Sequence, residues 1–137
     1  MENLNIALVQ MEVVAGDVER NRRHGLALVR EAAANAGIIA LPEIWTTGYA
    51  LRDVAALAET DEGPTISGLK EIARSCRVNI VAGSIPYRLG EDVYNGTVVI
   101  DHNGLVIADY QKVHMFSMYN EQRFFAQGAK RAVFPLA

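Results

Sequence analysis

Two charged side chains, Glu43 and Lys112, stand at the ends of apolar segments and are the first candidates for chemistry. Glu43 directly follows the apolar run 38–42, which reads Ile-Ile-Ala-Leu-Pro. Ligands of α/β proteins bind beyond the carboxyl ends of such strands. Partial burial there is expected to raise the pKa of the Glu43 carboxyl group towards the range that suits a general base. The alternative is an exposed glutamate without a chemical role.

Lys112 ends a segment in which apolar and polar residues alternate. A period of two places its side chain on the same face as Val106, Ala108 and Tyr110, opposite Asp109. An unpaired ammonium group on a buried face is costly or loses its proton, so Lys112 needs a partner. The alternative is a structural lysine at a strand end.

Glu43 is the expected partner of Lys112, because each residue ends a strand at the same edge of the sheet. A carboxylate–ammonium separation of about 4 Å or less would bring them within salt-bridge reach. Glu121 follows Lys112 in a loop or short helix, and on its own it is typical of a solvated side chain.

Cys76 is the only cysteine, so it has to be weighed as a nucleophile. It shares the apolar stripe of a predicted helix with Ile66, Leu69 and Ile72, close to the C-terminus of that helix. Apolar surroundings and the negative end of the helix dipole both disfavour a thiolate. We therefore expect a packed and unreactive side chain.

The remaining patterns exclude several classes of site. Phosphate-binding glycine loops and the Gly-x-Ser-x-Gly elbow are absent, and the three histidines lack metal-ligand spacing, so we expect no metal and no organic cofactor. The net charge of -3 argues against a nucleic-acid partner. No signal peptide or membrane span is expected, and a single cysteine fits a reducing cytoplasm.

Hydrophobic periodicity predicts alternating strands and helices followed by a hairpin, an order typical of an α/β domain with a mixed sheet. Strands are expected at 4–10, 38–41, 79–82, 97–101 and 105–110, and helices at 18–36, 54–58 and 65–76. The first strand is nearly continuously apolar and is expected to be covered on both faces. Asp17 is a predicted N-cap, and Asn103-Gly104 is a hairpin signal in which both residues accept positive φ.

The last residues, 132–137, have the pattern of the start of another strand and include the apolar sequence Val133-Phe134-Pro135-Leu136-Ala137. Chains usually end in something short, polar and mobile. We therefore expect the sequence to be cut within a domain.

Taken together, four segments in this order resemble the nitrilase superfamily of carbon–nitrogen hydrolases over essentially the whole chain. They are the opening strand Asn5–Gln10, Leu41-Pro42-Glu43 with Gly48-Tyr49, Ala82–Pro86 with Tyr94-Asn95, and Tyr110–Phe116. The pattern from Lys112 through Glu121 to Gly128 is most similar to the ω-amidase branch, which hydrolyses side-chain amides of small dicarboxylate monoamides.

The resemblance implies half of a four-layer α-β-β-α sandwich, with residues 1–137 forming an incomplete domain that ends before the catalytic cysteine. It implies a Glu–Lys–Cys mechanism through a thioester, in which Glu43 is the general base, Lys112 stabilises the oxyanion and Glu121 supports the lysine. Tyr49, His114 and Phe116 match substrate-pocket positions. No cofactor is implied; the implied partners are a small amide substrate, a second copy in a homo-oligomer, or a missing C-terminal half.

Two alternatives remain open. The chain could be a non-enzymatic half-domain that serves as a binding or assembly module, or an unrelated α/β hydrolase in which Glu43 and Asp109 hold a metal. If the chain is half of a sandwich, either as part of an enzyme or as a binding module, we expect an exposed apolar surface. The layers that normally cover the sheet would then be absent.

Overall fold

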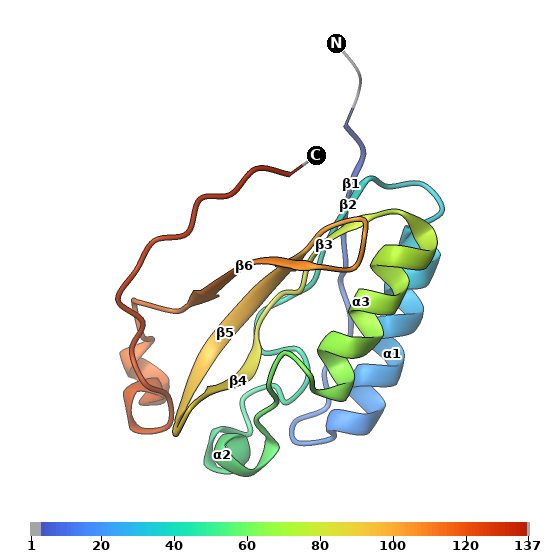
Figure 1. Ribbon diagram of the computed structural model, residues 1–137. Helices are drawn as coiled ribbons and strands as arrows, with labels where there is room; N and C mark the ends of the chain where they lie inside the picture. Colours follow the sequence, from blue (N-terminus) through green and yellow to red (C-terminus); the bar gives the residue numbers. More distant parts are fainter. Residues whose placement is uncertain (1–3, 137) are drawn as a thin grey trace.

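The computed structural model describes residues 4–136, which form one mixed six-stranded sheet (Figure 1). Its strands run in the order β1-β2-β3-β5-β4, and β6 pairs with β5. β1, β2 and β3 are parallel to one another, whereas β4 and β6 are both antiparallel to β5. The strands are β1 (Ile6–Leu8), β2 (Ile38–Ala40), β3 (Asn79–Val81), β4 (Ile85–Leu89), β5 (Asp92–Ile100) and β6 (Val106–Gln111).

Two long helices, α1 (Val18–Ala32) and α3 (Pro64–Cys76), lie side by side on one face of this sheet (Figure 1). α1 connects β1 to β2 and α3 connects β2 to β3. Two successive crossovers of the same hand between neighbouring parallel strands place both helices on the same side. The expected α/β fold with a mixed sheet is confirmed.

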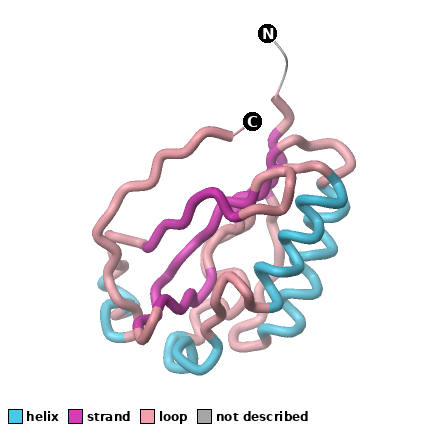
Figure 2. Tube along the Cα trace, in the orientation of Figure 1, coloured by secondary structure: helices cyan, strands magenta, loops and turns pink. Residues whose placement is uncertain are grey.

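The core lies between these helices and the sheet. Its fully buried side chains come from both layers: Val29, Ile39, Trp45, Ile66, Leu69, Ile72, Ile80 and Ile100. A smaller cluster of Ile44, Leu51, Val54, Val93 and Phe125 packs beneath α2 (Val54–Leu57) and the loops after β6. Residues 4–136 also contain three short 3₁₀ helices, η1 (Leu51–Asp53), η2 (Ser117–Tyr119) and η3 (Glu121–Arg123). Loops join all these elements (Figure 2).

Several element boundaries differ from the sequence-based expectation. Asp17 caps α1 as predicted, but the helix ends at Ala32 rather than at residue 36. β4 was not predicted, and β5 begins at Asp92 instead of residue 97. In the hairpin, Gly104 alone takes positive φ, because the Asp101 side chain accepts hydrogen bonds from the Asn103 and Leu105 amides and shapes the turn.

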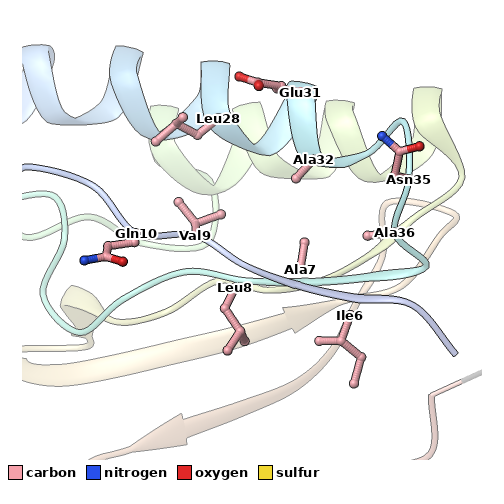
Figure 3. A pocket seen from close by; sticks show the side chains of 10 residues that line it. All are labelled: Ile6, Ala7, Leu8, Val9, Gln10, Leu28, Glu31, Ala32, Asn35 and Ala36. Carbon is pink, nitrogen blue, oxygen red and sulfur yellow. The ribbon is translucent and has the colours of Figure 1, made fainter.

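The expectation that the first strand is covered on both faces is wrong. β1 is the edge strand, and Ala7 and Val9 point towards α1 while Ile6 and Leu8 point to the other side (Figure 3). Ile6 is 57% exposed and Leu8 80% exposed, and Leu4 just before the strand is also exposed. Alternation along a strand therefore gives one covered face and one bare apolar face.

A hollow of about 580 Å³ is lined by β1, by α1 and by residues just after each of them (Figure 3). Glu31 is the only ionisable side chain among its lining residues, so this hollow holds no candidate pair for chemistry.

The expected strand at 132–137 is absent from the described residues, and Ala137 lies outside them. The C-terminal segment instead runs across the sheet on the side away from the helices, as the red trace in Figure 1 shows. Ala132, Val133 and Phe134 line a hollow of about 430 Å³ together with Val99 of β5 and Ala108 of β6. No neighbouring strand among residues 4–136 supplies the pairing that a strand there would need.

Cys76 is exposed, so the expectation of a packed cysteine is also wrong. Its stripe partners Ile66, Leu69 and Ile72 are buried, but Cys76 is the last residue of α3. The chain turns at once into a left-handed residue, Arg77, and the Cys76 side chain stays exposed at the helix end. Within the described part of the chain, no helix is long and apolar enough to cross a membrane.

The bare face of β1 predicts association. We expect the chain to bind an apolar dye or to self-associate in sedimentation, and Leu8→Lys to reduce both, because that side chain lies on this face. The substitution should change the free energy of unfolding by no more than about 0.5 kcal/mol, since the residue is already exposed. Leu105→Lys, an exposed leucine in the hairpin loop, is the matched control. A monomer that binds no dye would contradict the prediction.

Candidate active site

Lys112 lies between two carboxylates. Its Nζ is 2.8 Å from Oε1 of Glu43 and 2.9 Å from Oε2 of Glu121. The expected proximity of Glu43 and Lys112 is therefore confirmed. The side chain of Glu121 is fully buried, that of Lys112 is 24% exposed and that of Glu43 is 48% exposed. The three groups thus run from the interior to the surface.

The ends of β2 and β6 bring Glu43 and Lys112 to the same edge of the sheet. Glu43 follows β2 after Leu41 and Pro42, and Lys112 is the first residue after β6. The Lys112 amide donates a hydrogen bond of 2.9 Å to the carbonyl of Asn95 on β5, which continues the sheet pairing up to the lysine. Strand position and period-two alternation are therefore sufficient to predict this pair.

Glu121 is the first residue of η3 and is not the solvated side chain that its sequence position indicates. The preceding residue, Asn120, takes positive φ and turns the chain inwards. Oε2 of Glu121 then accepts a hydrogen bond of 2.8 Å from the Phe116 amide in addition to its contact with Lys112. A buried charge needs such partners, since desolvation otherwise costs more than the fold can offset.

Asn95 is a member of the site that sequence reasoning did not assign. It is buried on β5, and its Nδ2 donates a hydrogen bond of 2.9 Å to Oε1 of Glu43. The sequence offered no clear signal for it, because the predicted strand begins at residue 97 and Asn95 lies before it. Asn95 also lines a hollow of about 260 Å³ in front of Glu43 and Lys112, together with Leu41, Pro42, Gly83, Ser84, Thr97 and Tyr110.

The pKa of Glu43 is lowered, which corrects the expectation of a raised value. Burial raises the pKa, as expected, but the hydrogen bonds from Lys112 and Asn95 and the positive charge of Lys112 together outweigh it. Burial likewise lowers the pKa of Lys112, but its hydrogen bonds to Glu43 and Glu121 outweigh this effect and raise the pKa. The pair is therefore held as carboxylate and ammonium at neutral pH.

The three predicted pocket residues take different positions. Tyr49 stacks on Tyr119 with ring centroids 4.9 Å apart, and Phe116 lies 5.3 Å from the same ring. Burial and the charges of Glu43 and Glu121 raise the pKa of Tyr49, but neither Tyr49 nor Phe116 lines the 260 Å³ hollow.

His114 is exposed and does not line the 260 Å³ hollow. The contribution of all three residues to a substrate pocket stays a prediction.

Neither Cys76 nor Asp109 joins this site. Cys76 precedes the start of β3, whereas the site lies beyond the carboxyl ends of the parallel strands. Asp109 is exposed on the face of β6 opposite Lys112 and pairs with Gln111. Asp109 and Glu43 are therefore not placed to hold a metal ion together. Residues 4–136 contain no cluster of three His, Cys, Asp or Glu side chains suited to a metal ion.

The arrangement combines a partly exposed carboxylate that can accept a proton with a cation that can stabilise a developing negative charge. Glu43 and Lys112 line the same hollow, and the buried Glu121 holds the Lys112 ammonium group from the interior side. Such a site suits attack by a nucleophile on a carbonyl-like carbon. Among the described residues, none of those lining the hollow is a cysteine.

Loss of the Asn95 amide should raise the pKa of Glu43. In Asn95→Leu the carboxylate loses a hydrogen bond that favours its charged form. The lowered pKa means that ionised Glu43 stabilises the fold above the ordinary value of 4.5, and that this stabilisation is lost as the pH falls through the folded-state pKa. The Glu43 contribution should therefore be smaller in the variant, and its loss should be complete at a higher pH.

Carboxyl NMR titration of Glu43 and acid unfolding measure these two effects. Asn103→Leu makes the same chemical change in the hairpin turn and should leave the Glu43 titration where it is. An unchanged Glu43 titration in Asn95→Leu would contradict the assigned hydrogen bond.

Known proteins include relatives that match most of this chain. The 2-oxoglutaramate amidase of Bacillus subtilis (strain 168) is 33% identical over 131 residues, which are 96% of this chain and 51% of that protein. The chloroplastic omega-amidase of Arabidopsis thaliana is 32% identical over 124 residues, which are 86% of this chain and 33% of that protein.

Among solved structures, a CN-hydrolase superfamily protein from Xanthomonas campestris, with an arsenic adduct in its active site, superposes with a TM-score of 0.89 at 29% identity. The match covers 99% of this chain and 50% of that one. The chain thus spans about half the length, or less, of these relatives.

Residues 5–136 match the model described as carbon-nitrogen hydrolase, which is nearly the whole chain. Fold, paired charges and sequence similarity lead to one conclusion: the chain belongs to the carbon–nitrogen hydrolase family of the nitrilase superfamily.

Proposed function

We propose that this chain supplies the carboxylate–lysine–carboxylate part of an amidase active site. The observation that carries the proposal is the position of Lys112 between Glu43 and the fully buried Glu121. Members of the family are hydrolases that act on carbon–nitrogen bonds. A lysine fixed by two carboxylates, one of which also faces a hollow, is the arrangement that such chemistry needs.

In the proposed reaction a cysteine from outside this chain attacks the amide carbon. Glu43 takes the thiol proton, and Lys112 stabilises the negative oxygen of the tetrahedral intermediate. The proton passes to the departing nitrogen, ammonia leaves and a thioester remains. Water, activated by Glu43, then hydrolyses the thioester to the carboxylic acid and the free thiol. Glu121 accepts hydrogen bonds from Lys112 and holds its ammonium group in place.

The exposure of Glu43 bears on its role as a base. A covering layer over the site would deepen its burial, and burial raises the pKa of this carboxyl group. In the complete site, the pKa would thus move towards the range of an efficient base. We infer that Glu43 acts only when the hollow is closed by another segment.

The proposed substrate is a small side-chain amide. Two similar proteins are a 2-oxoglutaramate amidase and an omega-amidase, and these names are the support for this class. We also propose that the protein acts in the cytoplasm, because its single cysteine suits a reducing compartment. Its partner in the complete site is either a C-terminal half of the same domain or a second copy.

A second candidate function is a binding or assembly module without activity. The observation that favours it is the bare apolar face of β1, together with the absence of a thiol among the residues that line the hollow. In this reading, the charged groups stabilise the fold and Glu43 is never used as a base.

An ammonia-release assay separates the two functions. We expect no hydrolysis of 2-oxoglutaramate by the chain alone, because the thiol nucleophile is missing from the site. Joined to the C-terminal half of the Bacillus subtilis relative, the chain should release ammonia. Glu43→Gln and Lys112→Met should each reduce that rate by about 10²-fold or more.

Folding of the fusion is checked by a cooperative melting transition. A folded fusion that releases no ammonia would favour the module. Turnover by the chain alone that survives Cys76→Ala would show that the mechanism is wrong. Turnover lost on Cys76→Ala without unfolding would make Cys76 the nucleophile.

A further inference from the structure

Ile44, which directly follows Glu43, holds a backbone conformation that its side chain disfavours. Its φ is +46°, and its side chain is fully buried. Positive φ is uncommon for non-glycine residues and is an outlier for a β-branched residue, because Cβ crowds the backbone. Such strain persists only where the surroundings fix the backbone firmly. Contacts from another part of the chain must therefore fix the backbone next to Glu43.

Ser84, in the loop between β3 and β4, makes the contacts that hold it. The Ser84 amide donates a hydrogen bond of 3.0 Å to the carbonyl of Pro42. Its Oγ accepts one of 2.9 Å from the Ile44 amide, and its carbonyl accepts one of 3.1 Å from the Trp45 amide. One residue thus binds the main chain on both sides of Glu43.

Gly83 permits this close approach. Its φ is +65°, and a Cβ built on it would lie 2.2 Å from the carbonyl oxygen of Pro42. No other residue type fits at that distance. A further tie comes from the Trp45 indole, whose Nε1 donates a hydrogen bond of 2.8 Å to the carbonyl of Ala82.

The consequence concerns the direction of the Glu43 side chain. With Pro42 and Ile44 fixed, the Cα–Cβ bond of Glu43 is fixed, and its Oε1 reaches both Asn95 and Lys112. A carboxylate on a free loop would instead turn into solvent, since nearly half of the side chain is exposed. The strained backbone at Ile44 thus accompanies a fixed direction of the Glu43 side chain.

We propose that Ser84 is a positioning residue for Glu43, acting through the hydrogen bond from the Ile44 amide to its hydroxyl group. The proposal rests on Glu43 being the general base proposed above, which makes its direction matter for the reaction. Ser84 itself transfers no proton and forms no bond to substrate in this account.

The test is the titration of Glu43 in the chain as it stands, followed by carboxyl NMR. In Ser84→Ala the Ile44 amide loses its acceptor, the segment relaxes and Glu43 moves away from Lys112. The pKa of Glu43 should then rise towards its ordinary value, because the contacts that lower it are weakened. Ser84→Thr keeps the hydroxyl group and should restore the original titration.

Three controls separate positioning from a general loss of stability. Thr65→Val removes a buried hydroxyl group from α3 that bonds to Glu59, and it should leave the Glu43 titration unchanged. Asp101, whose pKa is lowered by the Leu105 amide, is an internal reference in every variant. Amide hydrogen exchange of the unmodified chain gives a readout even if Ser84→Ala does not fold, since the Ile44 amide should be protected.

An unchanged Glu43 titration in folded Ser84→Ala, or an Ile44 amide that exchanges freely in the unmodified chain, would overturn the proposal. So would a Thr65→Val variant that shifts the Glu43 titration as far as Ser84→Ala does. None of these measurements requires hydrolysis. A failed amidase assay would therefore count against the proposed function alone, and a failed titration against the positioning role alone.

Discussion

The fully buried carboxylate of Glu121 is the constraint on which the rest of this structure depends. A charge in that position is tolerated only with close partners, and its partners are the Lys112 ammonium group and the Phe116 amide. Lys112 must therefore stay at the end of β6, and its remaining hydrogen-bonding capacity is directed to Glu43 after β2. One buried charge thus links η3, β6 and the loop after β2 into a single unit.

Much of this unit can be predicted from the sequence, because the residues that carry it follow short strands. Glu43 follows an apolar run and Lys112 continues an alternating face, so strand geometry alone brings them together. The burial of Glu121 cannot be predicted in the same way, since it depends on the left-handed turn at Asn120. The sign of the Glu43 pKa shift was missed because burial was weighed without the opposing effect of Lys112, whose hydrogen bond and charge lower the pKa together with the hydrogen bond from Asn95.

The errors in the fold have physical causes of the same kind. β4 contains a proline and lies at the edge of the sheet, where a missing amide is tolerated and the usual strand signal is weak. The sequence of β1 predicts a strand buried on both faces because its residues are nearly all apolar, whereas α1 covers only one face among residues 4–136. Apolar composition indicates that a surface is buried, but not which segment buries it.

The one-sided cover and the half-open candidate site occur in a chain that spans about half the length of the relatives it matches. The chain matches relatives about twice as long, its sheet has helices on one face, and Glu43 opens into a hollow that lacks a thiol. In the proposed account, a second segment covers the bare face and brings the nucleophile towards Glu43. The contacts of the charged trio need no such segment, because they all lie within this chain.

A thermodynamic cycle on Lys112 and Glu121 tests this account most directly. Lys112→Met leaves the Glu121 charge buried without its cation and should reduce the free energy of unfolding by about 3–5 kcal/mol. Adding Glu121→Gln removes that charge, so the double variant should be clearly more stable than the two separate losses predict. Urea unfolding of the four proteins measures the coupling. Strictly additive losses would contradict the claim that the buried charge pair organises the site.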